Sequence, residues 1–331
     1  MNRAFYLLAY TIPVAVWISL EFPESLSFFA LLYAFGFLPL MELLLPASKE
    51  NPSDAVAEKL RESRFFDLLL YSMLPIQAFL VASFCRVFES QDLPPSTRIG
   101  LVTALGVACG VIGINVAHEL GHRKSRFERI LARLLLASSL NWQFYIEHNR
   151  GHHRNVSTPN DPESARLHES IYAFFVRAIR DSFKNAWRLD APEMRIGALS
   201  EIALLSCIGF FFGPMTLFGF MCSALFGILL LQSVNYIEHY GLSRKETSPG
   251  VFEAVRPHHS WNANPYLSRA ILFELSRHSD HHAYATRKYQ ILRHHEEAPQ
   301  MPTGYPGMIL LALVPPLWFR VMDRRIPNPH H

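Results

Sequence analysis

Long apolar runs alternate with polar stretches along this chain. Six runs are long enough to cross the hydrocarbon core of a membrane, which takes roughly 20 residues, and they cover residues 4–21, 26–46, 66–85, 98–119, 198–213 and 215–237. Gly213 and Pro214 predict a tight turn, so the last two runs should form a hairpin. The pattern predicts an all-α integral membrane protein with six transmembrane helices, in a single domain over residues 1–331.

A seventh apolar run, 307–319, is too short to be a span. It also contains Pro315 and Pro316, and we expect a buried or interfacial segment there. Residues 126–147 carry an apolar stripe at helical spacing with arginines opposite, which predicts one helix along the membrane surface or under the spans.

Basic residues mark one side of the predicted bundle. Of the 31 Lys and Arg residues, all but Arg86 and Arg98 fall at the N-terminus or in segments 47–65, 120–197 and 238–331, which six spans place on one side. The positive-inside rule then puts both termini and a helical cap, made from the two long segments, in the cytoplasm. A net charge of +3 is too small to indicate nucleic-acid binding.

The cysteines point to no redox or zinc chemistry. All four lie inside apolar runs and none forms a CxxC pair, which favours packing in the core over a disulfide framework.

Nine of the 16 histidines fall into four short clusters, each where an apolar helix would leave the membrane. The first two, HELGH and EHNRGHH, contain His118, His122, His148, His152 and His153; the others, NYIEHYG and RHSDHH, contain His239, His278, His281 and His282. His118 and His122 stand four residues apart and share one helix face, where both can reach one metal ion; the second and fourth clusters repeat such spacings. Imidazole is the commonest protein ligand for iron, zinc and copper. Nine imidazoles exceed what one metal ion can take, so the clusters predict two.

Two other functions fit the histidine motifs less well. HELGH alone matches the HExxH pattern of zinc proteases, with Glu119 as general base, but such a site needs one further ligand rather than seven. A metal transporter with a histidine-lined path needs ionisable residues inside its spans. Apart from Glu42, the apolar runs are nearly free of them.

The other histidines are weaker candidates. His168 is isolated and is expected at the surface, and residues 294–295 lie in a charged stretch where solvation is expected. Residues 258–259 could support the metal site without binding the metal. His330 and His331 end the chain and are not assigned to the metal site.

The clusters and their flanking residues resemble those of the bacterial membrane alkane 1-monooxygenases, relatives of the membrane fatty-acid desaturases and xylene monooxygenases. The matching stretches are HELGH, EHNRGHH with its continuation RNVSTPNDPESAR, NYIEHYGL and LSRHSDHHAYATRKYQIL, within residues 100–300. Desaturases share three histidine boxes but usually lack the NYIEHYG element. The resemblance implies a non-haem diiron centre with the nine clustered histidines as ligands. Acidic residues inside the motifs are then candidates to orient these imidazoles by accepting their outer N–H; they are Glu119, Glu147, Asp161, Glu238 and Asp280.

The same resemblance implies a reaction and its partners. The expected activity is hydroxylation of the terminal methyl of an alkane or similar molecule with O2, the alternative being a desaturase-like or xylene-monooxygenase-like enzyme. The chain has no flavin, nicotinamide or iron–sulfur motif, so the implied electron donor is a rubredoxin fed by an NAD(P)H-dependent rubredoxin reductase. A basic cap would attract an acidic rubredoxin. The implied location is the bacterial cytoplasmic (inner) membrane, while the substrate and its chain length stay open.

Overall fold

The computed structural model describes residues 3–90 and 92–327, and within them nearly all regular structure is helical. Five helices are long and apolar enough to cross a membrane. Helices suit that environment because they satisfy their own backbone hydrogen bonds. Their segments are η1 Arg3–Tyr10 with α1 Thr11–Glu21; α2 Pro23–Leu26, α3 Phe29–Leu32, η2 Tyr33–Phe37 and α4 Leu38–Leu44; α6 Arg64–Phe88; α7 Pro95–Ala108, η3 Cys109–Ile114 and α8 Asn115–Gly121; and α13 Ala191–His239. His330 and His331 lie outside the described residues.

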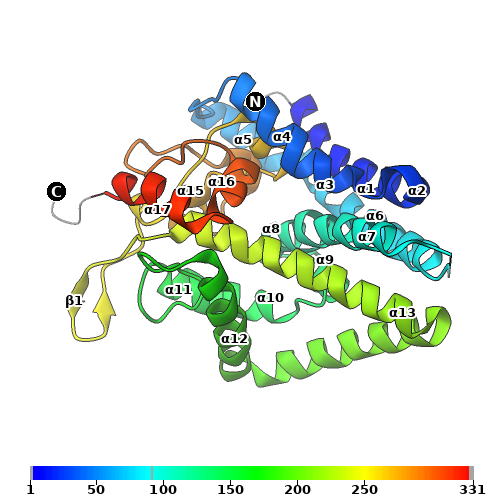
Figure 1. Cartoon of the computed structure of the whole chain (residues 1–331). Helices are drawn as coiled ribbons and strands as arrows, with labels where there is room; N and C mark the ends of the chain where they lie inside the picture. The colour runs from blue at the N-terminus through cyan, green and yellow to red at the C-terminus, as the bar shows by residue number, and fades with distance from the viewer. Residues whose placement is uncertain (1–2, 91, 328–331) are drawn as a thin grey trace.

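The helix α13 is a hairpin with two arms. At Gly213 the backbone has φ 79° and ψ 172°, a conformation that is essentially restricted to glycine. Pro214 follows and begins the second arm. Figure 1 shows the arms meeting at the right-hand end of the molecule and diverging toward the other end. The turn predicted at this dipeptide is confirmed.

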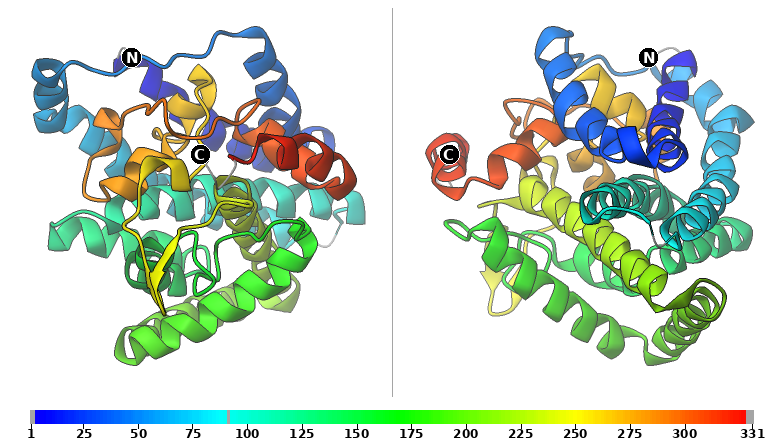
Figure 2. Two further views of the ribbon diagram at one scale, coloured as in Figure 1. Left: turned by 90° about the vertical axis from the view of Figure 1, so that its left-hand side faces the viewer. Right: turned by 45° about the vertical axis from the view of Figure 1, so that its right-hand side comes forward.

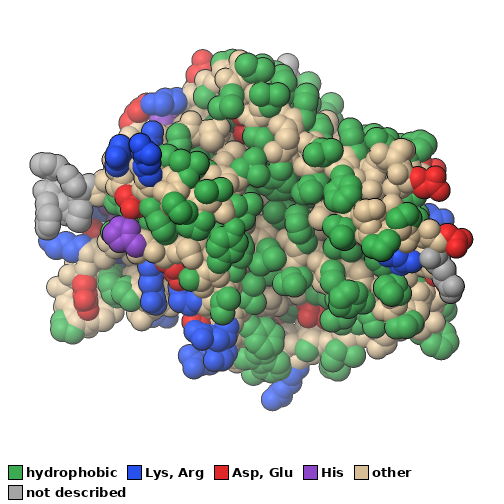
Figure 3. Space-filling model, in the orientation of Figure 1, with side chains coloured by type: hydrophobic (Ala, Val, Ile, Leu, Met, Phe, Trp, Pro, Cys, Tyr) green, Lys and Arg blue, Asp and Glu red, His purple; other side chains and the backbone are tan. Residues whose placement is uncertain are grey.

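Apolar side chains cover the outside of the long helices (Figure 3). On the first arm of α13, Leu199 is 68% exposed and Phe210 is 84% exposed. A soluble monomer rarely exposes so much contiguous apolar surface, whereas lipid can cover it without cost. Together with the five apolar helices, this surface identifies a membrane protein.

The second arm of α13 packs closely against α7 and η3. A Cβ atom placed on Gly227 would lie 2.6 Å from Cys109 Cβ and 3.0 Å from the backbone nitrogen of Gly110. Only a residue without a side chain allows this approach. The contact brings the ends of α8 and α13 together, and both ends carry clustered histidines.

Shorter elements form a cap that reaches from the left-hand end of Figure 1 to the middle of the molecule, and this left-hand end faces the viewer in the left panel of Figure 2. Most Lys and Arg side chains visible in Figure 3 gather at or below this end. The elements are α5 Asp54–Glu62, α9 Arg126–Ala137, α10 Gln143–Glu147, η4 His148–His152, α11 His153–Asn155, α12 Ile171–Leu189, the antiparallel strands β1 Glu246–Ser248 and β2 Val251–Phe252, η5 Pro257–His259, α14 Tyr266–Ile271, α15 His278–Ala283, η6 Tyr289–Ile291, α16 Tyr305–Ala312, α17 Pro315–Met322 and η7 Asp323–Arg325.

Residues 126–147 differ from the prediction of one continuous helix. The helix α9 ends at Ala137, and Leu140 adopts a φ of 51°, which a continuing helix does not permit. The chain re-enters a helix only at Gln143. The short run 307–319 forms parts of α16 and α17, as expected for a segment that does not span.

Candidate metal centre

Nine histidines from four segments converge where the long helices meet the cap. They come from α8 and the residue after it, from η4 and α11, from the last residue of α13, and from α15. They form two groups, in each of which the members offer one ring nitrogen apiece within 4.8 Å of one another. The five-histidine group is His118, His122, His148, His153 and His281, and the four-histidine group is His152, His239, His278 and His282.

In the five-histidine group the Nε2 atoms lie at contact distance. His118 Nε2 is 2.9 Å from His281 Nε2, and His122 Nε2 is 3.0 Å from His148 Nε2. His153 Nε2 lies 3.0 Å from that of His148 and 3.1 Å from that of His281. A neutral imidazole carries one N–H, so successive contacts through the same nitrogens cannot all be good hydrogen bonds. A metal ion with bonds of about 2.1 Å holds ligands at right angles about 3 Å apart, which fits these spacings.

The four-histidine group shows the same convergence. His278 Nε2 is 3.1 Å from His239 Nε2 and 2.8 Å from His282 Nε2. His152 Nε2 is buried and has no hydrogen-bond partner among the described residues. A buried nitrogen without a partner is costly unless something else binds it. The donor set therefore fits a second metal ion.

Helical spacing does not predict which histidines share a group. His118 and His122, four residues apart, do belong together. The pair His148 and His152 is split between the groups, and so is the i, i+3 pair of α15. One cause is local, because residues 148–152 form a π-helix, whose wider turn changes the directions of its side chains.

Burial keeps the clustered imidazoles outside the spans neutral. It lowers the pKa of His122 to about 3, and the nearby charges of His152 and Arg123 add to the effect. His152 is the exception, because Asp161 outweighs burial and raises its pKa. Neutral imidazole is the form that binds metal ions. Burial likewise lowers the pKa values of His148, His153, His278, His281 and His282 far below the usual range.

Asp161 takes the position expected of an orienting carboxylate. Its Oδ2 lies 2.9 Å from Nδ1 of His152 and accepts a 2.6 Å hydrogen bond from the Ser164 hydroxyl. This contact places the proton of His152 on Nδ1 and leaves Nε2 free to bind a metal. Glu147, the neighbour of His148, instead accepts a hydrogen bond from the Asn185 amide at 3.0 Å.

Two other predicted carboxylates pair with cations. Glu119 Oε1 lies 2.7 Å from a guanidinium nitrogen of Arg123. Asp280 lies 2.6 Å from Arg287, and its Oδ1 is 2.7 Å from Nε2 of His295. Glu119 Oε1 also accepts a 3.2 Å hydrogen bond from the backbone N–H of Tyr289, which connects α8 to η6, and Asp280 connects α15 to the segment around His295.

Glu238 is placed differently from the other predicted carboxylates. Its Oε1 accepts a 2.6 Å hydrogen bond from the Tyr305 hydroxyl. Its Oε2 is 3.1 Å from Nε2 of His278, the nitrogen on the metal-binding side of the ring. Tyr305 was not found by sequence reasoning, because it lies outside every histidine motif.

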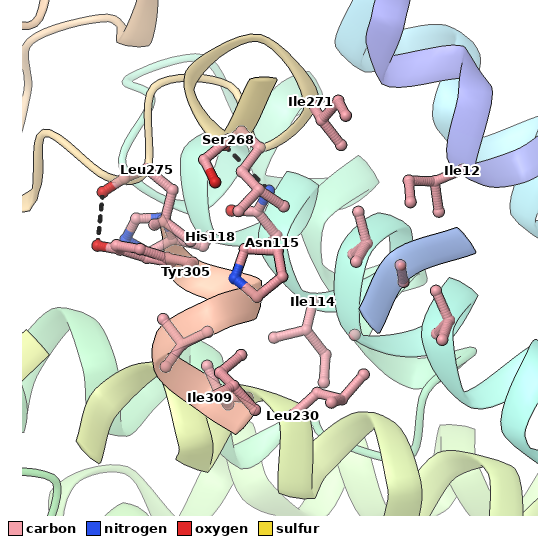
Figure 4. A pocket seen from close by; sticks show the side chains of 18 of the residues that line it. Ile12, Ile114, Asn115, His118, Leu230, Ser268, Ile271, Leu275, Tyr305 and Ile309 are labelled. Atoms are coloured by element: carbon pink, nitrogen blue, oxygen red, sulfur yellow. Dashed lines mark hydrogen bonds between the residues drawn. The ribbon is translucent and has the colours of Figure 1, made fainter. Parts of the chain in front are cut away.

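An apolar cavity with an open mouth reaches both groups. His118 and His148 of the five-histidine group and His278 of the four-histidine group line it. Figure 4 shows aliphatic side chains around the space, among them Ile114 and Ile309. The cavity can hold a hydrophobic molecule against the histidines.

The other described histidines lie outside both groups. His168 is exposed, as expected, and its Nε2 is 3.2 Å from Asp323. His258 and His259 form a separate cluster with Glu253. The prediction that His294 is solvated is wrong, since its side chain is only 3% exposed.

Comparison with known proteins identifies the relatives of the chain. Residues 96–312 match the model of the fatty acid desaturase family. The chain is 41% identical over 313 residues to alkane 1-monooxygenase 1 of Alcanivorax borkumensis, which covers 90% of this chain and 77% of that protein. It is 38% identical over 335 residues to an alkane 1-monooxygenase of Pseudomonas putida, with 95% and 82% covered. A xylene/toluene monooxygenase hydroxylase component of Pseudomonas putida is 29% identical over 291 residues, with 82% and 77% covered.

Proposed function

Since this chain belongs to the alkane 1-monooxygenase family, within the wider fatty acid desaturase family, we propose that it hydroxylates the terminal methyl group of an alkane at a centre of two iron ions. The chain is a monooxygenase, an oxidoreductase that uses O2. The observation that carries the proposal is one apolar cavity that ends on histidines of both groups. Acids, bases and nucleophiles do not react with an unactivated C–H bond, so the cofactor must supply the oxidising chemistry.

The two groups of histidines would each hold one iron ion. Bound there, the metals would use O2, two electrons and two protons to place one oxygen atom in the substrate C–H bond and release the other as water. The chain contributes ligands, orientation and a dry environment. Asp161 keeps His152 in the tautomer that binds metal, and the apolar cavity holds the hydrocarbon beside the centre.

We propose that the substrate reaches the cavity from the lipid bilayer. Phe35 of η2 and Leu231 and Val234 of α13 line the cavity and are also partly exposed to the surroundings. An alkane dissolved among lipid chains could pass between these helices and present its end to the histidines. In this proposal both arms of α13 span the inner membrane, which makes six spans, and the termini and cap lie in the cytoplasm.

Electrons are proposed to arrive at the cap from a rubredoxin and its NAD(P)H-dependent reductase. His122 and His153, both in the five-histidine group, are only partly buried. Lys124 and Arg154 are exposed close to them in the sequence. An acidic carrier would be attracted to these basic residues and would dock beside the metal centre.

The test uses the detergent-purified full chain with rubredoxin, its reductase, NADH and 18O2. We expect about two iron ions per chain and 1-octanol from octane, with one 18O atom in the product. His148→Ala should lose iron and activity together, while His168→Ala, a change to an exposed histidine outside both groups, should keep both. A protein with one zinc and no iron would contradict the diiron centre.

A methyl-aromatic substrate is the second candidate, favoured by the 29% identity to the xylene/toluene monooxygenase hydroxylase component. Feeding octane, xylene and acyl lipids to the same preparation separates the possibilities. A terminal alcohol from octane supports alkane hydroxylation, a benzylic alcohol from xylene supports the second candidate, and a new double bond in a lipid indicates a desaturase.

A further inference from the structure

Glu238 faces the metal-binding side of the four-histidine group. Its Oε2 is 3.1 Å from His278 Nε2, while the same nitrogen lies 3.1 Å from His239 Nε2 and 2.8 Å from His282 Nε2. One nitrogen thus has three polar neighbours at nearly equal distance. A single N–H can point at only one of them, so hydrogen bonding from His278 does not explain the arrangement.

A shared metal ion does explain it. When His278 Nε2 binds a metal it has no proton to donate, and an anionic oxygen 3.1 Å away cannot be its hydrogen-bond acceptor. That oxygen instead has the spacing found between the ligand nitrogens of the same group. Carboxylates are common partners of imidazole around non-haem iron.

We propose that Glu238 is a protein ligand of the metal held by the four-histidine group, an inference that rests on the diiron centre proposed above. The two sites then have equal numbers of protein ligands: five histidines at one, and four histidines with one carboxylate at the other. The carboxylate also offsets part of the positive charge of two metal ions in a buried, mostly apolar place.

Tyr305 fixes the orientation of this ligand. Its hydroxyl donates a 2.6 Å hydrogen bond to Glu238 Oε1 and lies 3.3 Å from the Leu275 carbonyl, a contact visible in Figure 4. The hydroxyl holds one carboxylate oxygen and leaves the other directed at His278. Both Glu238 and Tyr305 line the cavity, so the carboxylate-bearing metal site faces the substrate. Tyr305 is a positioning residue.

The experiment is Mössbauer spectroscopy and iron-affinity measurement on the 57Fe-loaded, reduced full chain. The wild type should show two quadrupole doublets of similar area, one for each coordination. Glu238→Gln should alter one doublet, leave the other in place, and lower the iron affinity of one site by more than about 100-fold, beyond the roughly 10- to 100-fold typical of a residue that only orients a ligand. Tyr305→Phe keeps the carboxylate and should shift the same doublet alone.

Glu42→Gln is the matched control. Glu42 is another buried carboxylate on the same cavity, and its Oε1 accepts a 2.8 Å hydrogen bond from the backbone N–H of Ser268. Both doublets should be unchanged in this variant.

Each result decides between distinct conclusions. Two irons whose doublets do not respond to Glu238→Gln would overturn the ligand assignment and leave the diiron proposal standing. A loss of affinity no larger than about 100-fold would put the carboxylate outside the coordination sphere. If Glu238→Gln does not fold, an unchanged spectrum of Tyr305→Phe overturns the assignment. A wild type without iron would refute the proposed function itself.

Discussion

Replacing Asp161 by Asn tests how the chain prepares His152 to bind a metal. Asp161 is buried and accepts three hydrogen bonds. Its Oδ2 receives them from His152 Nδ1 at 2.9 Å and the Ser164 hydroxyl at 2.6 Å, and its Oδ1 receives one from the backbone N–H of Glu163 at 3.1 Å. Asparagine has the same shape but presents one NH2 group in place of an oxygen.

Neither orientation of the amide preserves these contacts. If the NH2 takes the place of Oδ1, it meets the backbone N–H of Glu163, donor against donor. If it takes the place of Oδ2, His152 must accept through Nδ1 and carry its proton on Nε2, which then cannot bind a metal. Loss of such a partner typically lowers metal affinity about 10- to 100-fold, which corresponds to about 1.4–2.7 kcal/mol.

The assay is competition for iron between the purified protein and a chelator of known affinity. Asp181→Asn is the matched control, since Asp181 pairs with Arg180 at 2.7 Å on the exposed side of α12 and should leave iron binding unchanged. The thermal unfolding temperature, measured without iron, separates metal loss from a general loss of stability. If Asp161→Asn binds iron as tightly as the wild type, the carboxylate does not set the tautomer of His152.

Three further changes test the packing and the cavity. Gly227→Ala would place a Cβ 2.6 Å from Cys109 Cβ of η3 and should cost about 1–3 kcal/mol of stability through overpacking. An unchanged unfolding temperature in detergent would show that α13 and η3 are not tightly packed at this point. Gly213→Ala has open space around its new methyl group, so the expected loss of about 1–3 kcal/mol of stability comes from the backbone conformation alone. An unfolding temperature equal to that of the wild type would argue against a fixed turn. Val234→Phe narrows the cavity and should shift hydroxylation toward shorter alkanes, by about fourfold in relative rate for each excluded methylene. Gas chromatography of the products from competing alkanes measures this shift. An unchanged product ratio would show that the substrate does not bind in this cavity.

The sequence by itself was sufficient to predict long apolar helices and to pick out the nine histidines that the fold brings together. Continuous apolar runs leave few choices of structure in a membrane, and the dipeptide Gly213-Pro214 marks its turn through the backbone preferences of its own two residues. Nine imidazoles in four short motifs likewise point to metal binding before any contact is known. The break near Leu140 could not be predicted from the apolar pattern. The apolar stripe continues across this position, whereas the helical backbone is interrupted there by the positive φ of Leu140.

Only the tertiary structure decided how the histidines divide and what lies beside them. Helical periodicity relates a side chain to its own helix axis, but each group joins residues from separate segments of the chain. His118 meets His281 across 163 positions, and His122 meets His148 across 26. Glu238 likewise reaches Tyr305 across 67 positions, in a contact that no local motif encodes. Residues so far apart in the chain become neighbours only when α8, α13 and the cap pack together. The division of the histidines into two groups and the cavity beside them therefore follow from that packing.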